Sequence, residues 1–227
     1  YYKLIAANLA LYVFFAKKHR MTIGIIATTD QKDALLAQGF AAESRIEWMD
    51  RPTQLPGLDA VIDLINLVDE YPSGWYESAS TLLFINQVEK PIPENWPGHF
   101  IRFNGWPGFW ERSIVEASIK EASFQAKAES ILAILYKKTE WVADLPGFLS
   151  ARILASIINE AYLTFGEGVS SKEDIDTAMT LGTNYPLGPF AWCEKIGKSR
   201  IYLLLNQLSA NNQQYQPAYL LKNEAGF

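Results

Sequence analysis

The sequence is poor in the residues that build disulfides and metal centres. Cys193 is the single cysteine, and His19 and His99 are the two histidines. One cysteine cannot form an internal disulfide, and three scattered ligands do not supply the three or four side chains of a zinc site. We therefore predict no bound metal, a reducing, cytoplasmic compartment, and a packing role for Cys193, which follows Trp192 in a helical stretch.

Clustered positive charge and long apolar runs are also missing. The chain has 20 Lys and Arg residues against 25 Asp and Glu residues, and Lys17 to Arg20 is its longest basic block. Binding to a polyanion needs clustered cations, so no nucleic-acid partner is predicted. The longest apolar run, Leu4 to Ala16, contains Asn8 and is shorter than the about 20 residues of a membrane span. It is followed by the basic block and not by a small-residue cleavage site, so we expect neither a membrane protein nor a signal peptide.

Strand and helix patterns alternate in the first half of the chain. Of the 227 residues, 49% are hydrophobic and 20% are charged, which is typical of a packed globular protein. Apolar runs bounded by turn residues predict buried strands, and the segments between them predict short helices. The predicted strands are Met21–Thr28, Arg45–Met49, Asp59–Leu67, Thr81–Val88 and Phe100–Phe103, and the predicted helices are Lys3–His19, Gln31–Gln38 and Gly74–Ser80. This order is typical of an α/β domain with a mainly parallel sheet.

The pattern becomes mainly helical after Pro107. Ser113–Tyr136 is predicted as one long helical stretch and Trp141–Ala143 as a last strand. From residue 148 onward, apolar residues recur at three- and four-residue spacing, which indicates amphipathic helices. We therefore expect a Rossmann-like α/β domain at residues 1–143 and an all-α domain at residues 144–227.

Glycines and capping residues mark the helices of the second half. The first of these helices is predicted to end at Gly166, because glycine accepts the left-handed conformation of a helix end. Ser170 and Ser171 each have an acidic residue three positions later, which is the spacing of a capping box. We expect a helix to begin there and to end at Gly182, and a further pair of helices to follow over Phe190–Leu208.

Asparagine follows three of the predicted strands, at Asn66, Asn86 and Asn104. Ligands of an open parallel sheet bind at the carboxyl ends of its strands, but asparagine is also common in turns. These residues are therefore either ligand contacts or turn formers. The G-x-G-x-x-G phosphate loop is missing, since Gly24 is an isolated glycine inside a strand. We expect Met21–Thr28 to be the second strand of a Rossmann sheet whose first strand and glycine loop are absent from this chain.

A series of short motifs runs through the second half of the chain. The series comprises Asp144-Leu145-Pro146-Gly147-Phe148, Arg152, Asn159-Glu160-Ala161, Glu167-Gly168-Val169, Glu173-Asp174-Ile175-Asp176, Tyr185-Pro186-Leu187-Gly188-Pro189-Phe190 and Gln216-Pro217-Ala218-Tyr219-Leu220-Leu221. In this order the motifs resemble the C-terminal domain of the 3-hydroxyacyl-CoA dehydrogenases. The resemblance implies a Rossmann domain followed by a helical domain that faces the substrate and forms a homodimer.

The resemblance also implies a reaction in fatty acid metabolism. Family members oxidise the hydroxyl of an L-3-hydroxyacyl-CoA with NAD, and a His at a strand end takes the hydroxyl proton while a Glu twelve residues later orients it. Glu116 matches that Glu, and Asn104 stands twelve residues before it. The resemblance thus assigns Glu116 and Asn104 to the catalytic site and Asn86 to the NAD site, and the place of Asn66 at a strand end makes it a second candidate for the NAD site.

The chain departs from the family pattern at two of these places. Asn104 in one register, or Ile101 or Arg102 in another, replaces the family's His, and Ala151 replaces an Asn that follows the Pro-Gly-Phe turn. None of these residues can accept a proton from a substrate hydroxyl. His99 stands at the start of its strand and is predicted to be an ordinary surface histidine. Without an imidazole beside it, Glu116 can also be a solvated carboxylate at the start of a helix.

Two functions remain open from the sequence. One is an NAD-dependent 3-hydroxyacyl-CoA dehydrogenase that acts on a 3-hydroxyacyl-CoA or a related hydroxy acid. The other is a catalytically inactive family member that binds an acyl-CoA or a nucleotide, or serves as a partner subunit. The motifs of the second half favour the first function, whereas Asn104 and Ala151 favour the second.

Overall fold

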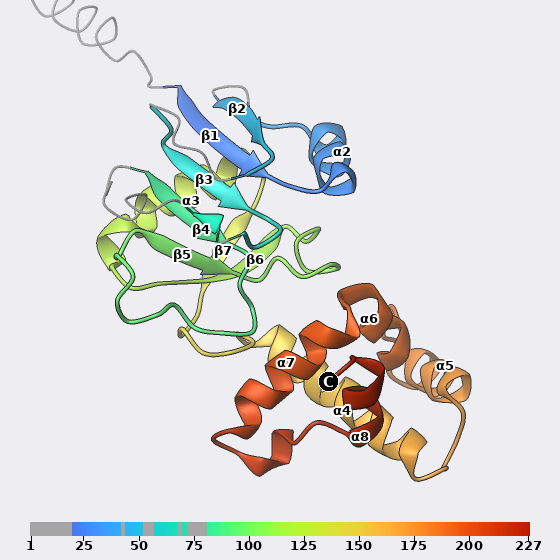
Figure 1. Ribbon diagram of the computed structural model, residues 1–227. Helices are drawn as coiled ribbons and strands as arrows, with labels where there is room; N and C mark the ends of the chain where they lie inside the picture. The colour runs from blue at the N-terminus through green and yellow to red at the C-terminus, as the bar shows by residue number, and fades with distance from the viewer. Residues whose placement is uncertain (1–19, 42–43, 52–56, 68–69, 72–80) are drawn as a thin grey trace, which may run out of the picture.

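The structure is a computed structural model, and it describes residues 20–41, 44–51, 57–67, 70–71 and 81–227. The helices predicted for Lys3–His19 and Gly74–Ser80 lie outside these residues. None of the described helices is long and apolar enough to cross a membrane. Figure 1 shows a sheet at one end of the molecule and a group of helices at the other.

One mainly parallel sheet organises the first half of the described chain. Its strands are β1 (Met21–Ile26), β2 (Ser44–Met49), β3 (Ala60–Asp63), β4 (Leu82–Ile85), β5 (Phe100–Phe103), β6 (Ile114–Ile119) and β7 (Lys138–Trp141). They lie in the order β2-β1-β3-β4-β5-β6-β7, and β6 runs antiparallel to β5. Every residue of β3, β4 and β5 is buried, as expected of strands that are covered on both faces. The predicted α/β sheet is confirmed.

The position of β1 in this sheet differs from the sequence prediction. β1 pairs in parallel with β2 on one side and with β3 on the other, so the strand order reverses at β1. In an order of 2-1-3-4-5 the first strand lies at this switch point, and the helix after it begins beside the ligand crevice. Helix α2 (Thr29–Gln38) follows β1 directly. The prediction that Met21–Thr28 forms the second strand of the sheet was wrong. An apolar run in the sequence indicates a buried strand but does not reveal which strands lie beside it.

The long helix predicted for Ser113–Tyr136 was also wrong in its first part. Residues Ile114–Ile119 form β6, which pairs with β5 and β7, and only Gln125–Ile134 forms a helix, α3, after a single 3-10 turn. β-branched residues at Ile114, Val115 and Ile119 favour the strand. The pairing of this segment with β5 and β7 makes it a strand. The spacing of apolar residues along the chain cannot reveal such pairing.

Five helices form the second half. They are α4 (Ser150–Gly166), α5 (Lys172–Thr183), α6 (Pro189–Ile196), α7 (Lys198–Ser209) and α8 (Tyr219–Glu224). The predicted end at Gly166 and the predicted cap at Ser171 are confirmed, since the Ser171 hydroxyl accepts from the N–H of Asp174 at 3.1 Å. Cys193 is fully buried among these helices, as predicted. The fold is thus an α/β sheet followed by a helical layer.

A hydrophobic cluster joins the sheet to the helices. Val88 follows β4, Trp106 and Phe109 follow β5, and all three pack with buried residues of α4, α6 and α7. Trp106 is completely buried, and its indole Nε1 donates to Glu89 Oε1 at 3.0 Å. The loops after β4 and β5 are therefore fixed on the helical layer, and they carry predicted site residues with them.

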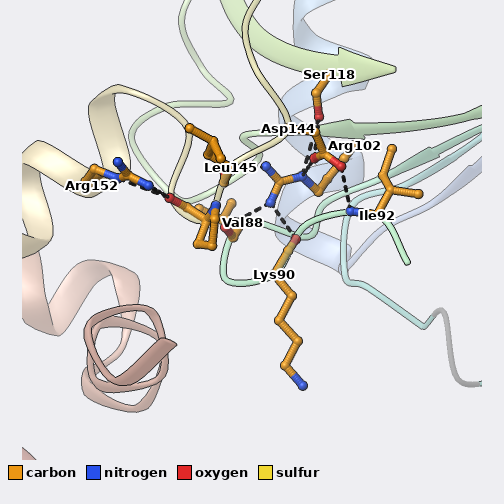
Figure 2. Close-up of polar contacts among 9 residues, drawn as sticks. Val88, Lys90, Ile92, Arg102, Ser118, Asp144, Leu145 and Arg152 are labelled. Carbon is orange, nitrogen blue, oxygen red and sulfur yellow. Dashed lines mark hydrogen bonds and ion pairs between the residues drawn. The ribbon is translucent and has the colours of Figure 1, made fainter. Parts of the chain in front are cut away.

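A buried arginine holds the segment that connects the two halves (Figure 2). The Arg102 guanidinium lies 2.8 Å from a carboxylate oxygen of Asp144, and it donates to the carbonyls of Leu145 at 2.6 Å and Val88 at 3.3 Å. The other oxygen of Asp144 accepts from the Ile92 N–H at 2.8 Å. Burial lowers the pKa of Arg102 to about 10, although Asp144 opposes this shift. The domain boundary near residue 144 stays a prediction, and this network is what connects the two sides.

Candidate substrate site between the sheet and helix α4

Asn104 and Glu116 lie together where β5 ends. The antiparallel ladder brings the Asn104 N–H to the Glu116 carbonyl at 2.9 Å, and the Asn104 Nδ2 donates to Glu116 Oε2 at 3.2 Å. The Ser150 N–H donates to the same carboxylate, at 3.0 Å to Oε1 and 3.3 Å to Oε2. Glu116 is therefore a half-buried strand residue with two donors, and its interpretation as a carboxylate at the start of a helix was wrong.

The start of helix α4 supplies one of those donors. The chain enters α4 through Gly147 and Phe148, which have φ angles of 78° and 48°, and the Gly147 N–H donates to the Val88 carbonyl at 2.8 Å. A residue other than glycine is strained at such an angle, so Gly147 suits this turn. The turn directs the Ser150 N–H at Glu116, and the positive end of the helix dipole favours a carboxylate there.

A cavity of about 410 Å³ borders the Asn104–Glu116 pair. Its other lining residues are Phe109, Arg112, Ser113, Ile114, Val115, Glu140 and Ser150. A second cavity of about 200 Å³ shares Phe109, Arg112 and Ser150 with the first, and is otherwise lined by Ile153, Leu154, Ile157, Tyr185, Pro186 and Trp192. The first cavity is polar near the carboxylate and the second is mostly apolar. The two cavities therefore adjoin at Phe109, Arg112 and Ser150, and one of them has a carboxylate while the other is mostly apolar.

The loop between β5 and β6 borders both cavities and involves two cations, Arg112 within it and Lys137 from the segment before β7. The Arg112 guanidinium lies 4.4 Å from the Phe109 ring centre, and its Nε donates to the Gly108 carbonyl at 3.2 Å. The Lys137 ammonium donates to the carbonyls of Trp110 at 2.7 Å and Arg112 at 3.0 Å, and burial lowers its pKa. Lys137 thus fixes the loop from inside, while Arg112 remains exposed at the border of the cavities.

Asn86, a predicted cofactor contact, joins three strand ends. Its Nδ2 donates to the carbonyls of Leu64 at 2.8 Å and Gly105 at 3.0 Å, and its Oδ1 accepts from the Gly105 N–H at 3.0 Å. A side chain at position 105 would collide with the Asn86 amide, so glycine permits this close approach. Both N–H groups of the amide are in use. A role in cofactor binding stays a prediction.

Asn66, the other predicted cofactor contact, has the geometry of a turn former. Its φ angle is 63°, in the left-handed region that asparagine tolerates. Its N–H donates to Asp63 Oδ1 at 2.8 Å, and its own Oδ1 is buried without a partner among the described residues. These contacts support the turn interpretation, and a role in cofactor binding stays a prediction here too.

Asp63 is a residue of this edge that sequence analysis missed. It is fully buried at the end of β3, where its carboxylate accepts from the N–H groups of Ile65 at 3.0 Å, Asn66 at 2.8 Å and Leu67 at 2.6 Å. Burial raises its pKa, although these donors oppose the shift. An acidic residue at the end of a fully apolar strand is the signal that could have singled it out.

His99 was predicted to lie on the surface, and this was wrong. It is 2% exposed and stands before β5, beside the ring of Phe100. Burial lowers its pKa, and its Nε2 has no hydrogen-bond partner among the described residues. Because β5 separates it from Asn104, His99 does not supply the imidazole that position 104 lacks. Ala151, the other departure from the family pattern, is fully buried in the helical cluster.

The end of β1 does not fit the pyrophosphate of a dinucleotide. A Rossmann loop brings glycine backbone close to the phosphates at a helix N-terminus. In this chain Thr28 caps α2 instead: its hydroxyl accepts from the Gln31 N–H at 3.3 Å, and its own N–H donates to Gln31 Oε1 at 3.0 Å. Asp30 adds a negative charge to the first turn.

One residue of this edge does match a Rossmann domain. Asp50 follows β2 directly, where such folds place the carboxylate that binds a ribose hydroxyl. Sequence analysis missed it because Met21–Thr28 was taken for the second strand. The described residues thus offer the ribose contact without the phosphate loop.

Known proteins resemble this chain most clearly in its second half. The profile of the family described as 3-hydroxyacyl-CoA dehydrogenase, C-terminal domain, matches residues 147–225. The 3-hydroxyadipyl-CoA dehydrogenase of Escherichia coli (strain K12) is 42% identical over 115 residues, which is 50% of this chain and 24% of that protein. The probable 3-hydroxybutyryl-CoA dehydrogenase of Bacillus subtilis (strain 168) is 32% identical over 152 residues, which is 63% of this chain and 53% of that protein.

A solved structure agrees over most of the chain. The (S)-3-hydroxybutyryl-CoA dehydrogenase from Ralstonia eutropha aligns with a TM-score of 0.68 at 20% identity, and the alignment covers 89% of this chain and 92% of that one. At this identity the likeness shows the fold alone. The chain spans about a quarter to a half of the curated relatives named above. The helical half of the chain, residues 147–225, thus matches the C-terminal domain of the 3-hydroxyacyl-CoA dehydrogenases, and the relatives' sequences and this fold agree with that match.

Proposed function

We propose that this chain provides the substrate side of a 3-hydroxyacyl-CoA dehydrogenase-type oxidoreductase. The observation that carries the proposal is the Asn104–Glu116 pair beside a cavity of about 410 Å³. In the family, the residues at these two positions handle the hydroxyl proton. The names of the two curated relatives support a hydroxylated acyl-CoA as the ligand.

Glu116 is the member of the Asn104–Glu116 pair that can exchange a proton with the ligand. Its carboxylate is ionisable, whereas the amide of Asn104 donates and accepts hydrogen bonds without taking up a proton at neutral pH. Asn104 Nδ2 gives one N–H to Glu116. Its second N–H is available for the oxygen on the third carbon of an acyl chain, in either the hydroxyl or the ketone form. The pair can therefore hold and polarise this oxygen, with Glu116 as the proton acceptor.

The mostly apolar second cavity gives the acyl chain a place. Ile153, Leu154 and Ile157 lie on successive turns of α4 and line it together with Pro186 and Trp192. Burying a methylene group contributes about 0.8 kcal/mol. An acyl chain that extends from Glu116 into this cavity is therefore bound through the burial of its methylene groups as well as through the contacts of its oxygen with the Asn104–Glu116 pair.

A second candidate function is binding without turnover. The specific observation in its favour is that Asn104, and not a histidine, contacts Glu116. Loss of a general base costs about 10²–10⁴-fold in rate. In this case the protein serves as an acyl-CoA-binding subunit. For either function we propose a homodimer formed through the helical half and a cytoplasmic location.

The two functions are separated by a turnover assay and a binding assay on the same preparation of the complete gene product. NADH absorbance is followed with acetoacetyl-CoA, and the quenching of tryptophan fluorescence by the same thioester is titrated. Steady NADH loss together with binding establishes the dehydrogenase, and binding alone establishes the second function. Absence of binding by native protein would refute the proposed substrate side altogether.

A further inference from the structure

We infer that the β1–α2 edge of this sheet is closed by its own side chains and takes no dinucleotide, so that the chain binds its acyl ligand without an NAD of its own. The inference starts from topology. The switch point between β1 and β3 is where a nucleotide-binding sheet of this strand order holds its ligand. The described residues at that point are the end of β1, the start of α2 and the loop after β3.

The hydrogen-bond donors at the start of α2 are the first obstacle. A pyrophosphate is held there by backbone N–H groups that have no partner in the helix. Thr28 and Gln31 bond to each other in both directions, side chain to backbone, so the N–H groups of both residues are occupied. A bound phosphate would have to break this capping box and then lie beside the Asp30 carboxylate.

The shape and the charge of the α2 start do not compensate for the occupied N–H groups of Thr28 and Gln31. Glycine lets the backbone approach the pyrophosphate, but Ala27, Thr28 and Thr29 each carry a side chain here. Lys32 is the nearest cation along the helix, and its ammonium lies 5.2 Å from the ring centre of Trp48 on β2. The first turn of α2 therefore carries an acidic residue, Asp30, whose charge disfavours a dianionic group at this helix start.

The loop after β3 is filled in the same way. Successive N–H groups of such a loop can form a concave anion site. Here the N–H groups of Ile65, Asn66 and Leu67 all donate to the Asp63 carboxylate. Side chains of the protein thus take two of the N–H donors at the start of α2, those of Thr28 and Gln31, and three in the loop after β3. Asp50 alone offers a ribose contact, and a ribose contact does not bind the phosphates.

The direct test is a titration of the folded protein with NADH. We expect no saturable change in NADH fluorescence up to about 1 mM, the weak end of specific affinity, while acetoacetyl-CoA binds to the same preparation. Saturable NADH binding that ADP-ribose displaces would overturn the inference. The acyl-CoA titration keeps the two ideas apart, because its failure would refute the proposed substrate side and leave the NADH result unaffected.

A second experiment tests whether the Thr28 cap and the Asp30 charge prevent phosphate binding at the start of α2. The double variant Thr28→Ala/Asp30→Ala removes the cap and the negative charge, and Lys32→Ala serves as a control in the same helix. We expect inorganic pyrophosphate to raise the Tm of the double variant by about 2 °C at matched ionic strength, with no such rise for the wild type or the control. An equal response of all three proteins would show that Thr28 and Asp30 do not close this edge.

Discussion

The Asn104 amide lies 3.2 Å from the Glu116 carboxylate, although twelve residues separate them in the chain. The antiparallel turn from β5 to β6 produces this approach, and the Ser150 N–H of α4 completes it from the helical half. Three separate elements thus converge on one carboxylate. The contact joins an ionisable carboxylate to an amide, which does not take up a proton at neutral pH.

Glu116→Gln is expected to weaken both the site and the fold. The Gln amide can accept through its oxygen only, so either Asn104 Nδ2 or the Ser150 N–H would face an NH2 group. One unsatisfied donor lowers the free energy of unfolding by about 1–2 kcal/mol, measured by urea unfolding. Acetoacetyl-CoA affinity, or turnover if present, should fall as well.

Glu140→Gln is the matched control for this change. Glu140 lies opposite Glu116 on the neighbouring strand β7 and lines the same cavity. It should leave unfolding and binding close to the wild-type values. Equal effects of the two variants would mean that the cavity responds to net charge and not to the contacts of Glu116.

Arg102→Lys is expected to destabilise the junction between the halves. Lysine retains the charge but lacks the planar fork that reaches Asp144, Leu145 and Val88 together. Breaking a buried network of this kind costs about 3 kcal/mol or more. Urea unfolding followed at the tryptophans measures the loss, and Arg45→Gln in the exposed pair with Glu47 should cost less than about 0.5 kcal/mol. A small effect of Arg102→Lys would show that the apolar cluster alone fixes the junction.

The thiol of Cys193 should make the protein less stable at high pH. Burial raises the pKa of Cys193 from 9.0 to about 11. Below pH 9 the thiol is neutral in the folded and unfolded states, and as pH rises from 9 to 11 it ionises only on unfolding. Stability is therefore lost across this range, by about 2–3 kcal/mol at most.

The Cys193→Ser variant isolates this effect. The difference in free energy of unfolding between the wild type and the variant should shrink as pH rises from 9 to 11. Burial also raises the pKa of Tyr162, but this hydroxyl is present in both proteins, so most of its contribution cancels. A difference that does not change with pH would contradict a buried neutral thiol.

Lys172 is expected to hold helix α5 in place. No residue of α5 is buried, yet the Lys172 ammonium lies 2.6 Å from Glu224 and within about 5 Å of three aromatic rings, those of Tyr162, Phe165 and Phe190. An ion pair of this exposure and cation–π contacts together contribute about 1–2 kcal/mol. Lys172→Gln should therefore speed amide hydrogen exchange in α5 by about tenfold, measured by mass spectrometry.

Lys198→Gln provides the comparison, because Lys198 also pairs with Glu224 but stands on α7. It should leave the exchange of α5 close to the wild type. Faster exchange throughout α4 to α8 in Lys172→Gln would indicate global destabilisation and not the release of one helix.

Local patterns in the sequence predicted the elements that local interactions determine. Phe100–Phe103 is a strand because its residues are apolar or packed on both faces, and α5 begins at Ser171 because the side chain caps the helix. The order of motifs in the second half was enough to recognise the family. These features depend on residues a few positions apart, so they are visible in a one-dimensional string.

Tertiary structure decided which distant segments meet. Only the strand pairing shows that β1 lies at the switch point and that Ile114–Ile119 is a strand paired with β5. Only the packed structure shows that His99 is buried. The sequence by itself determined that a histidine is missing at position 104 and a phosphate loop is missing from the chain. The folded protein decided that Asn104 still contacts Glu116 and that Thr28 caps the helix beside the missing loop, because strand pairing and helix packing set these distances.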